Sequence, residues 1–412
     1  WRYLEAIEKY RKSIELDPSY FDAYLNLSKC LIKIDEPLKA EEIAAKAIEI
    51  DPDHESGYIN HGLALCCRGE LRAGALSYYR AAKRNPDAPE PHANLGFALL
   101  ALEEFSTGWD EFEYGFLTDS RGPVIDTPTP VWKGQPLDGR LIHVYGEQGI
   151  GDQIMYGTML QDLLDQGAKI IFECEGRLIP LFERAFPEIS VVELTRPPNP
   201  DTRVPGEDFR SAVGSLGRWV RRSVDAFKPR DKFMSPDPEL TNKFRKTYSQ
   251  LGDGPVIGIS WKSNSPNFAK NKNIPIDLWH PILETPGCHF VSLQYGDVDE
   301  DIAQAKREFG IDIYVDDDVS AMNSLEQSAA QISAVDLVIS ISNATIHFAG
   351  SCGVKTWMLL GYTPLWHWGL SREDTLWYNS VRCIRCQSED DWENIVDRTA
   401  RDLSVFVAEH GT

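Results

Sequence analysis

The sequence has little positive charge relative to its negative charge. Lysine and arginine together number 42, against 63 aspartate and glutamate residues, which gives a formal net charge of −21 at pH 7. Because such a chain repels phosphate backbones and anionic lipid surfaces, this composition argues against nucleic acid or a membrane surface as a partner. It leaves room for a local basic pocket that binds one small anion.

The sequence also lacks an apolar run long enough for a transmembrane helix, and it shows no signal peptide. Its eight cysteines are scattered, mostly in apolar contexts, as buried free thiols are. This pattern indicates a reducing compartment and predicts a cytoplasmic location. The chain begins at Trp1, without a methionine and inside a repeat pattern, so we expect further residues to precede it.

Several motifs of cofactor and metal sites are missing. Gly149 and Gly151 lack the third glycine of a dinucleotide fingerprint, because Ile154 stands there, and no P-loop motif occurs. Cys383 and Cys386 form one CxxC pair without a second pair or a histidine pair, so we interpret it as structural, with zinc as the alternative. The acidic residues at 297–301 and 316–318 do not match an EF-hand and are expected to form surface loops. The sequence therefore predicts no metal site and no required cofactor.

Residues 1–118 contain a 34-residue repeat, marked by Pro18, Pro52 and Pro86. Small residues recur with the same period: Ala6, Ala40, Gly74 and Gly108 form one set, and Ser13, Ala47, Ala81 and Gly115 another. This pattern is that of the tetratricopeptide repeat, in which two antiparallel helices touch through small side chains. We expect the second helix of one repeat, two full repeats, and a last aromatic-rich pair over residues 91–117. Such an array offers a groove for an extended peptide or helix, or else acts as a rigid spacer or dimerisation element.

Residues 119–140 are rich in proline and glycine and are expected to be a linker. Strand and helix patterns then alternate, which predicts two α/β domains with parallel sheets at 141–254 and 255–385, and a C-terminal helix within 386–412. The expected strands are 141–146, 169–173, 189–194, 255–261, 289–294, 337–341 and 354–360. The expected helices are 152–166, 178–186, one within 233–254, one from 278, 318–333, 345–352 and 391–407.

The stretch 336–361 predicts a strand, a short helix and a second strand. Ser342, Asn343 and Thr345 lie where the helix begins, and such side chains cap free backbone N–H groups. The positive end of this helix would bind an anion at the carboxyl end of the strand, where open α/β sheets bind ligands. His347, one turn into the helix, would contact a phosphate or orient the loop, or else be a buried histidine with its hydrogen bonds satisfied.

A glycine-rich turn joins the first expected strand to its helix, and Asp152 begins that helix. An aspartate there caps a helix well, and it would also be a general base if its second oxygen faced the substrate. Glu147, at the end of the strand, is the alternative base. In the segment 262–275, Lys262, Lys270 and Lys272 bring positive charge that suits a diphosphate, the alternative being a solvated loop.

These segments, in this order, resemble bacterial proteins in which tetratricopeptide repeats precede a GT-B glycosyltransferase domain of the heptosyltransferase type, glycosyltransferase family 9. The resembling segments are the repeats, the Gly151-Asp152 turn, Lys272 three residues before Pro275, the SNATIH helix at 342–347, and the tryptophan-rich stretch 366–382. The resemblance implies an α-helical repeat solenoid followed by two Rossmann-like domains that face each other across a cleft. The first would bind the acceptor and the second the nucleotide sugar, and the last helix would cross back to the first.

The resemblance implies inverting, metal-independent transfer of a sugar from a nucleotide sugar to an acceptor hydroxyl. Asp152 would be the base, with Glu147 as the alternative, while Lys272 and the helix start at Asn343–Thr345 would neutralise the departing diphosphate. Lys262, Ser342 and His347 complete the predicted donor-binding set.

One position departs from this pattern. Heptosyltransferases carry an aspartate five residues before the helix histidine, where this chain has Ser342. ADP-heptose and a lipopolysaccharide acceptor therefore lose support, and the repeats favour a protein or peptide acceptor held in their groove. The alternative is a non-catalytic repeat scaffold whose GT-B half is a degenerate nucleotide-binding domain.

Overall fold

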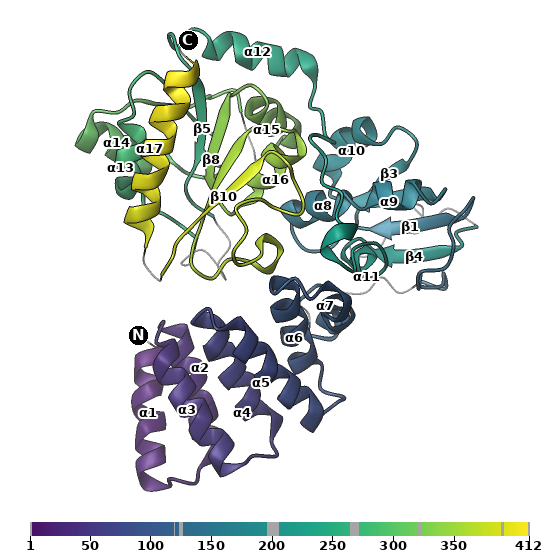
Figure 1. Ribbon diagram of the computed structural model, residues 1–412, viewed down its shortest axis with the longest axis vertical. Coiled ribbons are helices and arrows are strands. Elements are labelled where there is room, and N and C mark those ends of the chain that lie inside the picture. Colours follow the sequence, from purple (N-terminus) through teal and green to yellow (C-terminus); the bar gives the residue numbers. More distant parts are fainter. Residues whose placement is uncertain are drawn as a thin grey trace. The chain divides into compact units, whose positions relative to one another are not determined.

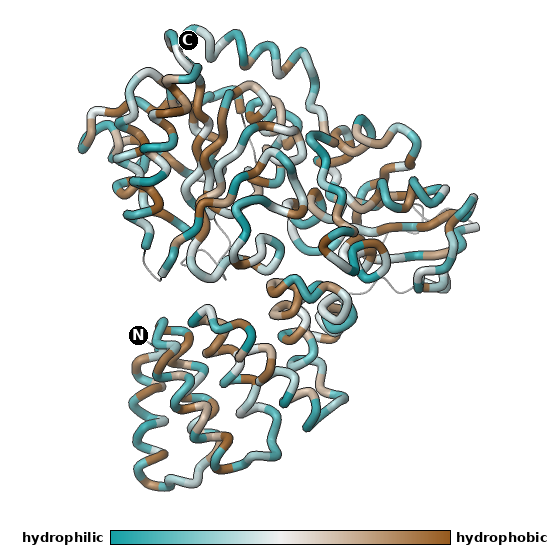
Figure 2. The backbone as a smooth tube through the Cα atoms, in the orientation of Figure 1, coloured by the Kyte–Doolittle hydropathy of each residue, from teal (hydrophilic) through white to brown (hydrophobic). Residues whose placement is uncertain are grey.

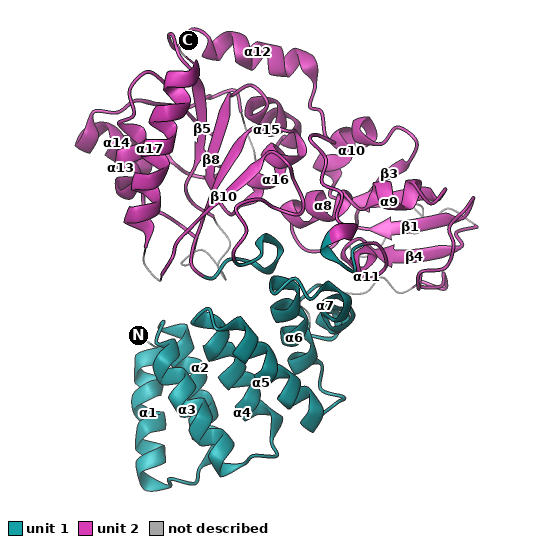
Figure 3. Cartoon of the chain, viewed as in Figure 1, with its two compact units in different colours: residues 1–124, 221–224, 363–370 teal, residues 125–220, 225–362, 371–412 magenta. Residues whose placement is uncertain are grey.

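A computed structural model describes residues 2–118, 120–122, 127–195, 206–263, 272–319, 323–388 and 391–410 (Figure 1). The chain divides into two compact units, which Figure 3 colours separately. The repeat unit comprises residues 1–124, 221–224 and 363–370, and the α/β unit comprises residues 125–220, 225–362 and 371–412. No described helix is long and apolar enough to cross a membrane.

The repeat unit is a stack of helices in which each helix packs on the next one in the chain. Its helices are α1 (Arg2–Leu16), α2 (Phe21–Lys33), α3 (Pro37–Ile50), α4 (Glu55–Cys67), α5 (Leu71–Arg84), α6 (Pro89–Ala101), α7 (Phe105–Phe112) and the 3₁₀ helix η1 (Glu113–Leu117). Ala40, Ala47 and Ala81 are fully buried, as the period predicts. A Cβ added at Gly74 would lie 3.0 Å from the carbonyl oxygen of Gly62, so α4 and α5 approach closely only because both positions lack a side chain.

Two short segments from later in the sequence complete the repeat unit. The ring of Trp109, on α7, lies edge to face on Trp366, with centroids 5.4 Å apart, and Trp366 begins η7 (Trp366–Trp368). The indole N–H of Trp109 donates to the carbonyl oxygen of Arg221 at 2.8 Å. Arg222 forms an ion pair with Asp110 at 3.1 Å. The aromatic last pair of helices therefore packs on chain that is encoded more than a hundred positions later.

The first sheet of the α/β unit has four parallel strands in the order β3-β2-β1-β4. Its strands are β1 (Leu141–Tyr145), β2 (Lys169–Cys174), β3 (Ser190–Glu193) and β4 (Phe209–Ala212). The accompanying helices are α8 (Ile150–Gly157), α9 (Leu160–Leu164), η2 (Gly176–Leu178), α10 (Ile179–Ala185), η4 (Gly214–Leu216), α11 (Gly217–Val220) and η5 (Val224–Ala226).

The single helix expected over 152–166 was wrong, because the structure has α8 and α9 with a break at Thr158. Both the backbone N–H and the hydroxyl of Thr158 bond to the carbonyl oxygen of Met155, three residues back. This tight turn replaces the bond to the fourth residue back that would have continued the helix.

The second sheet has six parallel strands in the order β10-β9-β8-β5-β6-β7. Its strands are β5 (Val256–Ser260), β6 (His289–Ser292), β7 (Ile313–Tyr314), β8 (Leu337–Ile341), β9 (Thr356–Leu360) and β10 (Val381–Arg385). Every residue of β5, β8 and β9 is buried, which explains their continuous apolar sequences. The helices are α12 (Pro238–Tyr248), η6 (Ile276–Trp279), α13 (His280–Leu283), α14 (Asp299–Phe309), α15 (Leu325–Ile332), α16 (Ala344–Ser351) and α17 (Trp392–His410). Figure 2 shows the contrast between the mostly hydrophobic central strands and the mostly hydrophilic helix α12.

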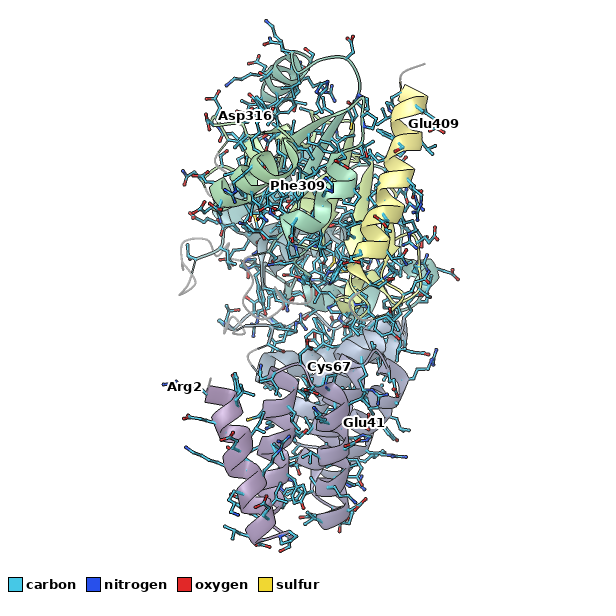
Figure 4. All side chains as sticks on the ribbon, turned by 90° about the vertical axis from the view of Figure 1, so that its left-hand side faces the viewer. Arg2, Glu41, Cys67, Phe309, Asp316 and Glu409 are labelled. Carbon is cyan, nitrogen blue, oxygen red and sulfur yellow. The ribbon has the colours of Figure 1, made fainter. Side chains whose placement is uncertain are left out.

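Three local expectations about the second domain need correction. The acidic residues from Asp299 to Asp301 form the first turn of α14 rather than a surface loop, where their charges complement the helix dipole. Helix α15 begins at Leu325, later than expected, because the side chain of Ser324 caps it by accepting from the N–H of Gln327. The last helix, α17, packs on α13, η6 and β10 of its own domain instead of crossing back to the first. Figure 4 labels Phe309 at the end of α14 and Glu409 near the end of α17.

The predicted fold class is confirmed. A helical repeat array precedes two all-parallel α/β sheets, each with its own helices, in the GT-B arrangement. The two sheets meet through α8 and α16, which pack against each other and lie side by side in Figure 1. Each of these helices follows the carboxyl end of a central strand, so their starting turns lie at the edges where parallel sheets bind ligands.

Candidate active site

The turn between β1 and α8 is held in place by backbone hydrogen bonds. The N–H of Gly146 donates to the carbonyl oxygen of Glu173 at 2.6 Å. The carboxylate of Glu147 is buried and accepts from the N–H of Gly214 at 2.8 Å, which ties the turn to the segment after β4. Gln148 has a left-handed backbone with φ of +56°, which is uncommon for a residue with a side chain. These hydrogen bonds and this backbone conformation fix the turn that leads into α8.

Asp152 does not begin or cap α8 as expected, because the N-cap is Gly149 and Asp152 is the third residue of the helix. It is half-buried, and its carboxylate accepts a hydrogen bond from the N–H of Gly149 at 3.0 Å. Burial raises the pKa of Asp152 to about 6, and the charge of Glu147 also raises it, while the Gly149 N–H and the charge of Lys272 act in the opposite direction. The carboxyl group thus changes its charge close to neutral pH. A group with these properties is suited to take up a proton at neutral pH.

The start of α16 is built differently. Asn343 is the N-cap, and its side-chain oxygen accepts from the N–H of Thr345 at 3.0 Å. Its amide nitrogen donates to the hydroxyl of Ser260, at the end of β5, at 2.7 Å, and to the carbonyl oxygen of Lys262 at 3.3 Å. The cap predicted from the sequence is confirmed, and it also ties β8 to β5. Ser342 and Thr345 are buried beside it.

The lysines of the segment 262–275 lie in different surroundings. The ammonium of Lys262 is bound by the carboxylate of Asp301 at 2.6 Å and by the carbonyl oxygen of Asp297 at 2.7 Å. The charge of Lys272, in contrast, acts on both Asp152 and His347. Burial lowers the pKa of Lys272, and the charge of Asp152 partly restores it. Lys270 lies outside the described residues.

His347 connects the two domains at the junction of α8 and α16. Its imidazole is buried, and a Cβ added at Gly151 would lie only 2.7 Å from its Cδ2 atom. Its Nδ1 atom is 3.0 Å from the hydroxyl of Tyr378. Burial lowers the pKa of His347 to about 3, and the positive charge of Lys272 acts in the same direction. The ring is therefore neutral at any pH at which the protein would work.

The structure thus brings together some of the residues singled out from the sequence. The charge of Lys272 acts on both Asp152 and His347, and the charge of Glu147 acts on Asp152. Asn343, Thr345 and Ser342 lie at the start of the helix that carries His347. The ammonium of Lys262 is engaged by residues at and before α14.

Tyr378 was not singled out, although it stands in the tryptophan-rich stretch that the resemblance covered. Burial raises its pKa well above its ordinary value, and the charge of Asp152 adds to this shift. The sequence signal was the pair Trp377-Tyr378 shortly before a strand, which alone does not distinguish a core aromatic from a functional one.

Among the described residues, no group of three or more histidine, cysteine, aspartate or glutamate side chains is arranged to hold a metal ion. Cys383 lies on β10 and Cys386 directly follows that strand, and both side chains are buried.

The fold defines the chain as a tetratricopeptide-repeat array joined to an α/β half of GT-B topology. The family model of the tetratricopeptide repeat matches residues 2–58, which confirms the repeats. Protein FlbA of Caulobacter vibrioides is 36% identical over 326 residues, which cover 75% of this chain and 54% of that protein. The chain therefore spans about half the length of this relative.

Several solved structures have low similarity to the chain. The glycosyl transferase family 9 protein from Veillonella parvula DSM 2008 matches with a TM-score of 0.47 and 14% identity, over 67% of this chain and 98% of that one. A mutant of the Thermobaculum terrenum O-GlcNAc transferase matches with a TM-score of 0.34 and 14% identity, over 99% of this chain and 88% of that one. MamA protein matches with a TM-score of 0.27 and 23% identity, over 29% of this chain and 65% of that one.

Proposed function

We propose that this chain is a glycosyltransferase that moves a sugar from a nucleotide-sugar donor to an acceptor hydroxyl, with inversion at the anomeric carbon and without a metal ion. The observation that supports this most is the pairing of groups from two domains. Asp152, with a pKa of about 6, comes from the first α/β domain, and Lys272 and His347 come from the second. A base and a cation that act on each other across two domains are what a two-substrate transfer needs.

In the proposed reaction, Asp152 takes the proton from the acceptor hydroxyl while that oxygen attacks the anomeric carbon from the face opposite the nucleotide. The bond between the anomeric carbon and the phosphate oxygen breaks, and its electron pair leaves with the nucleotide. General-base assistance of this kind contributes about 10²–10⁴-fold to the rate. Glu147 is the alternative base, although its carboxylate already accepts from the N–H of Gly214.

The departing phosphate carries the negative charge that develops. We assign its stabilisation to Lys272 and to the backbone N–H groups at the start of α16, because a fixed cation and a helix N-terminus both favour an anion. Because Asn343 caps the helix with a neutral amide, no carboxylate opposes an anion at that cap. A lysine in this position would supply the charge that other glycosyl-transfer sites take from a divalent ion.

We further propose that the acceptor is a protein or peptide recruited by the repeat unit. A stack of antiparallel helix pairs presents an extended surface, which is suited to a long ligand rather than a small one. The scattered cysteines of the chain, most of them in apolar surroundings, support a reducing, cytoplasmic location for this reaction.

Donor binding is tested by measuring the melting temperature with a panel of nucleotides and nucleotide sugars. A ligand at ~100 times its dissociation constant should stabilise the folded chain by about 2.7 kcal/mol. Lys272→Ala should remove most of that stabilisation. The matched control is Lys243→Ala, because the ammonium of Lys243 pairs with Asp318 on the surface, at 2.7 Å. If no nucleotide or nucleotide sugar stabilises the protein, the transferase proposal fails.

Acceptor recruitment is tested by removing residues 1–86, which leaves α6 and α7 in place. Transfer to a protein acceptor should be lost, whereas hydrolysis of the donor, which reports an intact α/β unit, should persist. Unchanged transfer would reduce the repeats to a spacer.

A further inference from the structure

Tyr378 is held both through its backbone and through its side chain. The hydroxyl of Thr375 accepts from its backbone N–H at 3.3 Å and from that of Trp377 at 2.9 Å. Tyr378 also forms a parallel β-bridge with Arg230, in the connection between the two α/β domains. The next residue, Asn379, donates to the carboxylate of Asp231 in the same connection, at 2.9 Å. The backbone of Tyr378 is therefore fixed from two directions.

The ring of Tyr378 is fixed as well. It lies against α16 at Gly350, where an added Cβ would be only 2.5 Å from the ring's Cγ atom. The side chain is 1% exposed, so its hydroxyl can find a partner only inside the protein. That hydroxyl reaches Nδ1 of His347 at 3.0 Å.

The opposite edge of the His347 ring meets the first domain. Its Cδ2 and Nε2 atoms would lie 2.7 Å and 3.2 Å from a Cβ added at Gly151, the residue before Asp152. A chain of contacts thus runs from Tyr378 through the imidazole to the backbone of the turn that carries the proposed base.

We propose that Tyr378 is a positioning residue, whose hydroxyl donates a hydrogen bond to Nδ1 of His347 and so keeps the ring proton on Nε2, the edge that faces Gly151. This inference rests on the proposed function, which makes the junction of α8 and α16 the place of transfer. A neutral imidazole has one protonated and one unprotonated nitrogen, and the partner of one nitrogen decides the state of the other. A phenol is the more acidic donor and an unprotonated imidazole nitrogen the stronger acceptor, so the pair favours donation from Tyr378.

The charge states of the neighbours agree with this direction. Burial lowers the pKa of His347 to about 3 and raises the pKa of Tyr378, so both side chains are neutral near pH 7. A protonated His347 would repel Lys272 and would lower the pKa of Asp152, making it a weaker base. The hydrogen bond from Tyr378 therefore gives the site a directed N–H donor that carries no charge.

The tautomer is tested directly by long-range ¹H–¹⁵N NMR of protein labelled at histidine, with His347→Gln identifying the signals. We expect an unprotonated Nδ1 and a protonated Nε2 between pH 5 and 8. Tyr378→Phe, which removes only the hydroxyl, should shift the ring to the other tautomer or to a mixture of the two. The inference would be overturned by a protonated Nδ1 in the unaltered protein, or by a tautomer that stays the same in Tyr378→Phe. Neither result depends on enzymatic activity, so neither bears on the proposed function.

Activity gives a second, independent test once a donor is identified. Tyr378→Phe should lower kcat about tenfold, the equivalent of one lost hydrogen bond, with KM for the donor changed less than about twofold. Combined with His347→Gln, it should lower kcat no further than His347→Gln alone, because Tyr378 acts through the imidazole. Effects that multiply would overturn the inference.

The control is Tyr248→Phe, another buried tyrosine, whose hydroxyl bonds to the carboxylate of Asp316 at 3.3 Å. Tyr248→Phe should leave kcat unchanged, while it should lower the melting temperature by about as much as Tyr378→Phe does. A loss of kcat in this control equal to that of Tyr378→Phe would show a general effect of packing and would also overturn the inference.

Discussion

The starts of α8 and α16 use side chains of different charge to accept a hydrogen bond from the backbone. Each helix follows the carboxyl end of a central strand, and backbone N–H groups at such a helix start need an acceptor. At α8 the bond is made by the carboxylate of Asp152, which burial holds at a pKa of about 6. At α16 it is made by Asn343, an amide whose oxygen and nitrogen are both engaged.

We relate this difference to two proposed roles, catalysis at the start of α8 and ligand binding at the start of α16. A neutral, fully bonded cap does not titrate and leaves the positive end of its helix available to an anion. A carboxylate kept partly buried costs stability when it ionises, and a fold with an equally good neutral cap available gains nothing from it structurally. We infer that Asp152 is charged for the reaction and Asn343 is neutral for the ligand.

The largest effect should come from replacing the carboxylate in the first turn of α8 with a neutral amide. In Asp152→Asn the amide oxygen can still accept from the N–H of Gly149, but the side chain can no longer take a proton. We expect kcat for transfer to fall about 10²–10⁴-fold, with nucleotide binding retained. Steady-state kinetics and melting curves measure the two effects. A fully active Asp152→Asn protein would make this residue only a cap, and Glu147→Gln would then be the variant to test.

The sequence was sufficient for the fold class and for the cap of α16, because both rest on local patterns. It was wrong for the cap of α8, because the N-cap there is Gly149 and Asp152 is the third residue of the helix. Strands with continuous apolar runs, the 34-residue period, and an asparagine or aspartate at a helix start are each encoded within a few residues. What the sequence did not reveal depended on contacts between distant segments. Lys262 and Lys272 look alike in sequence, but the ammonium of Lys262 is bound by Asp301 on α14 and by the carbonyl oxygen of Asp297, in a segment that was expected to form a loop.

The contact between His347 and Tyr378 belongs to the same class. The two residues are 31 positions apart, and they meet because β9 and the loop after it return the chain to α16. The packing of Trp109 on Trp366 likewise joins segments with no shared local pattern. Pairings of this kind follow from the completed fold, not from periodicity or residue type.

A second prediction concerns stability. Because the folded pKa of Asp152, about 6, lies above the unfolded value near 3.9, the folded state holds its proton more tightly. The resulting stabilisation is fully present below about pH 4 and is lost as the pH rises through about 6, on the order of 2–3 kcal/mol. The free energy of unfolding should therefore fall between pH 4 and pH 8 relative to that of Asp152→Asn, in matched denaturant titrations. Parallel curves for the two proteins would mean that the carboxyl group is not perturbed.

The reverse exchange at α16 should be harmful. Asparagine and aspartate cap helices about equally well, so Asn343→Asp keeps the bond to Thr345. It removes the donors to Ser260 and to the carbonyl oxygen of Lys262, and it buries a charge in their place. We expect a loss of about 1–3 kcal/mol of stability, measured by chemical denaturation, together with weaker nucleotide binding. A variant as stable as the original protein would remove the contrast between the two caps.

The smallest effect, and the one most specific to Asp152, should be the pH dependence of the rate. A base with a pKa of about 6 must be deprotonated to act, so kcat should be level above about pH 7 and fall below pH 6. One unit below the pKa, at about pH 5, roughly one tenth of the base is active, and the rate should be about tenfold below its plateau. His347 should contribute nothing to this limb, since its pKa of about 3 lies outside the window. The residual activity of Asp152→Asn should show no such limb. A limb that persists in Asp152→Asn would assign the titration to another group and would transfer the role of base to Glu147.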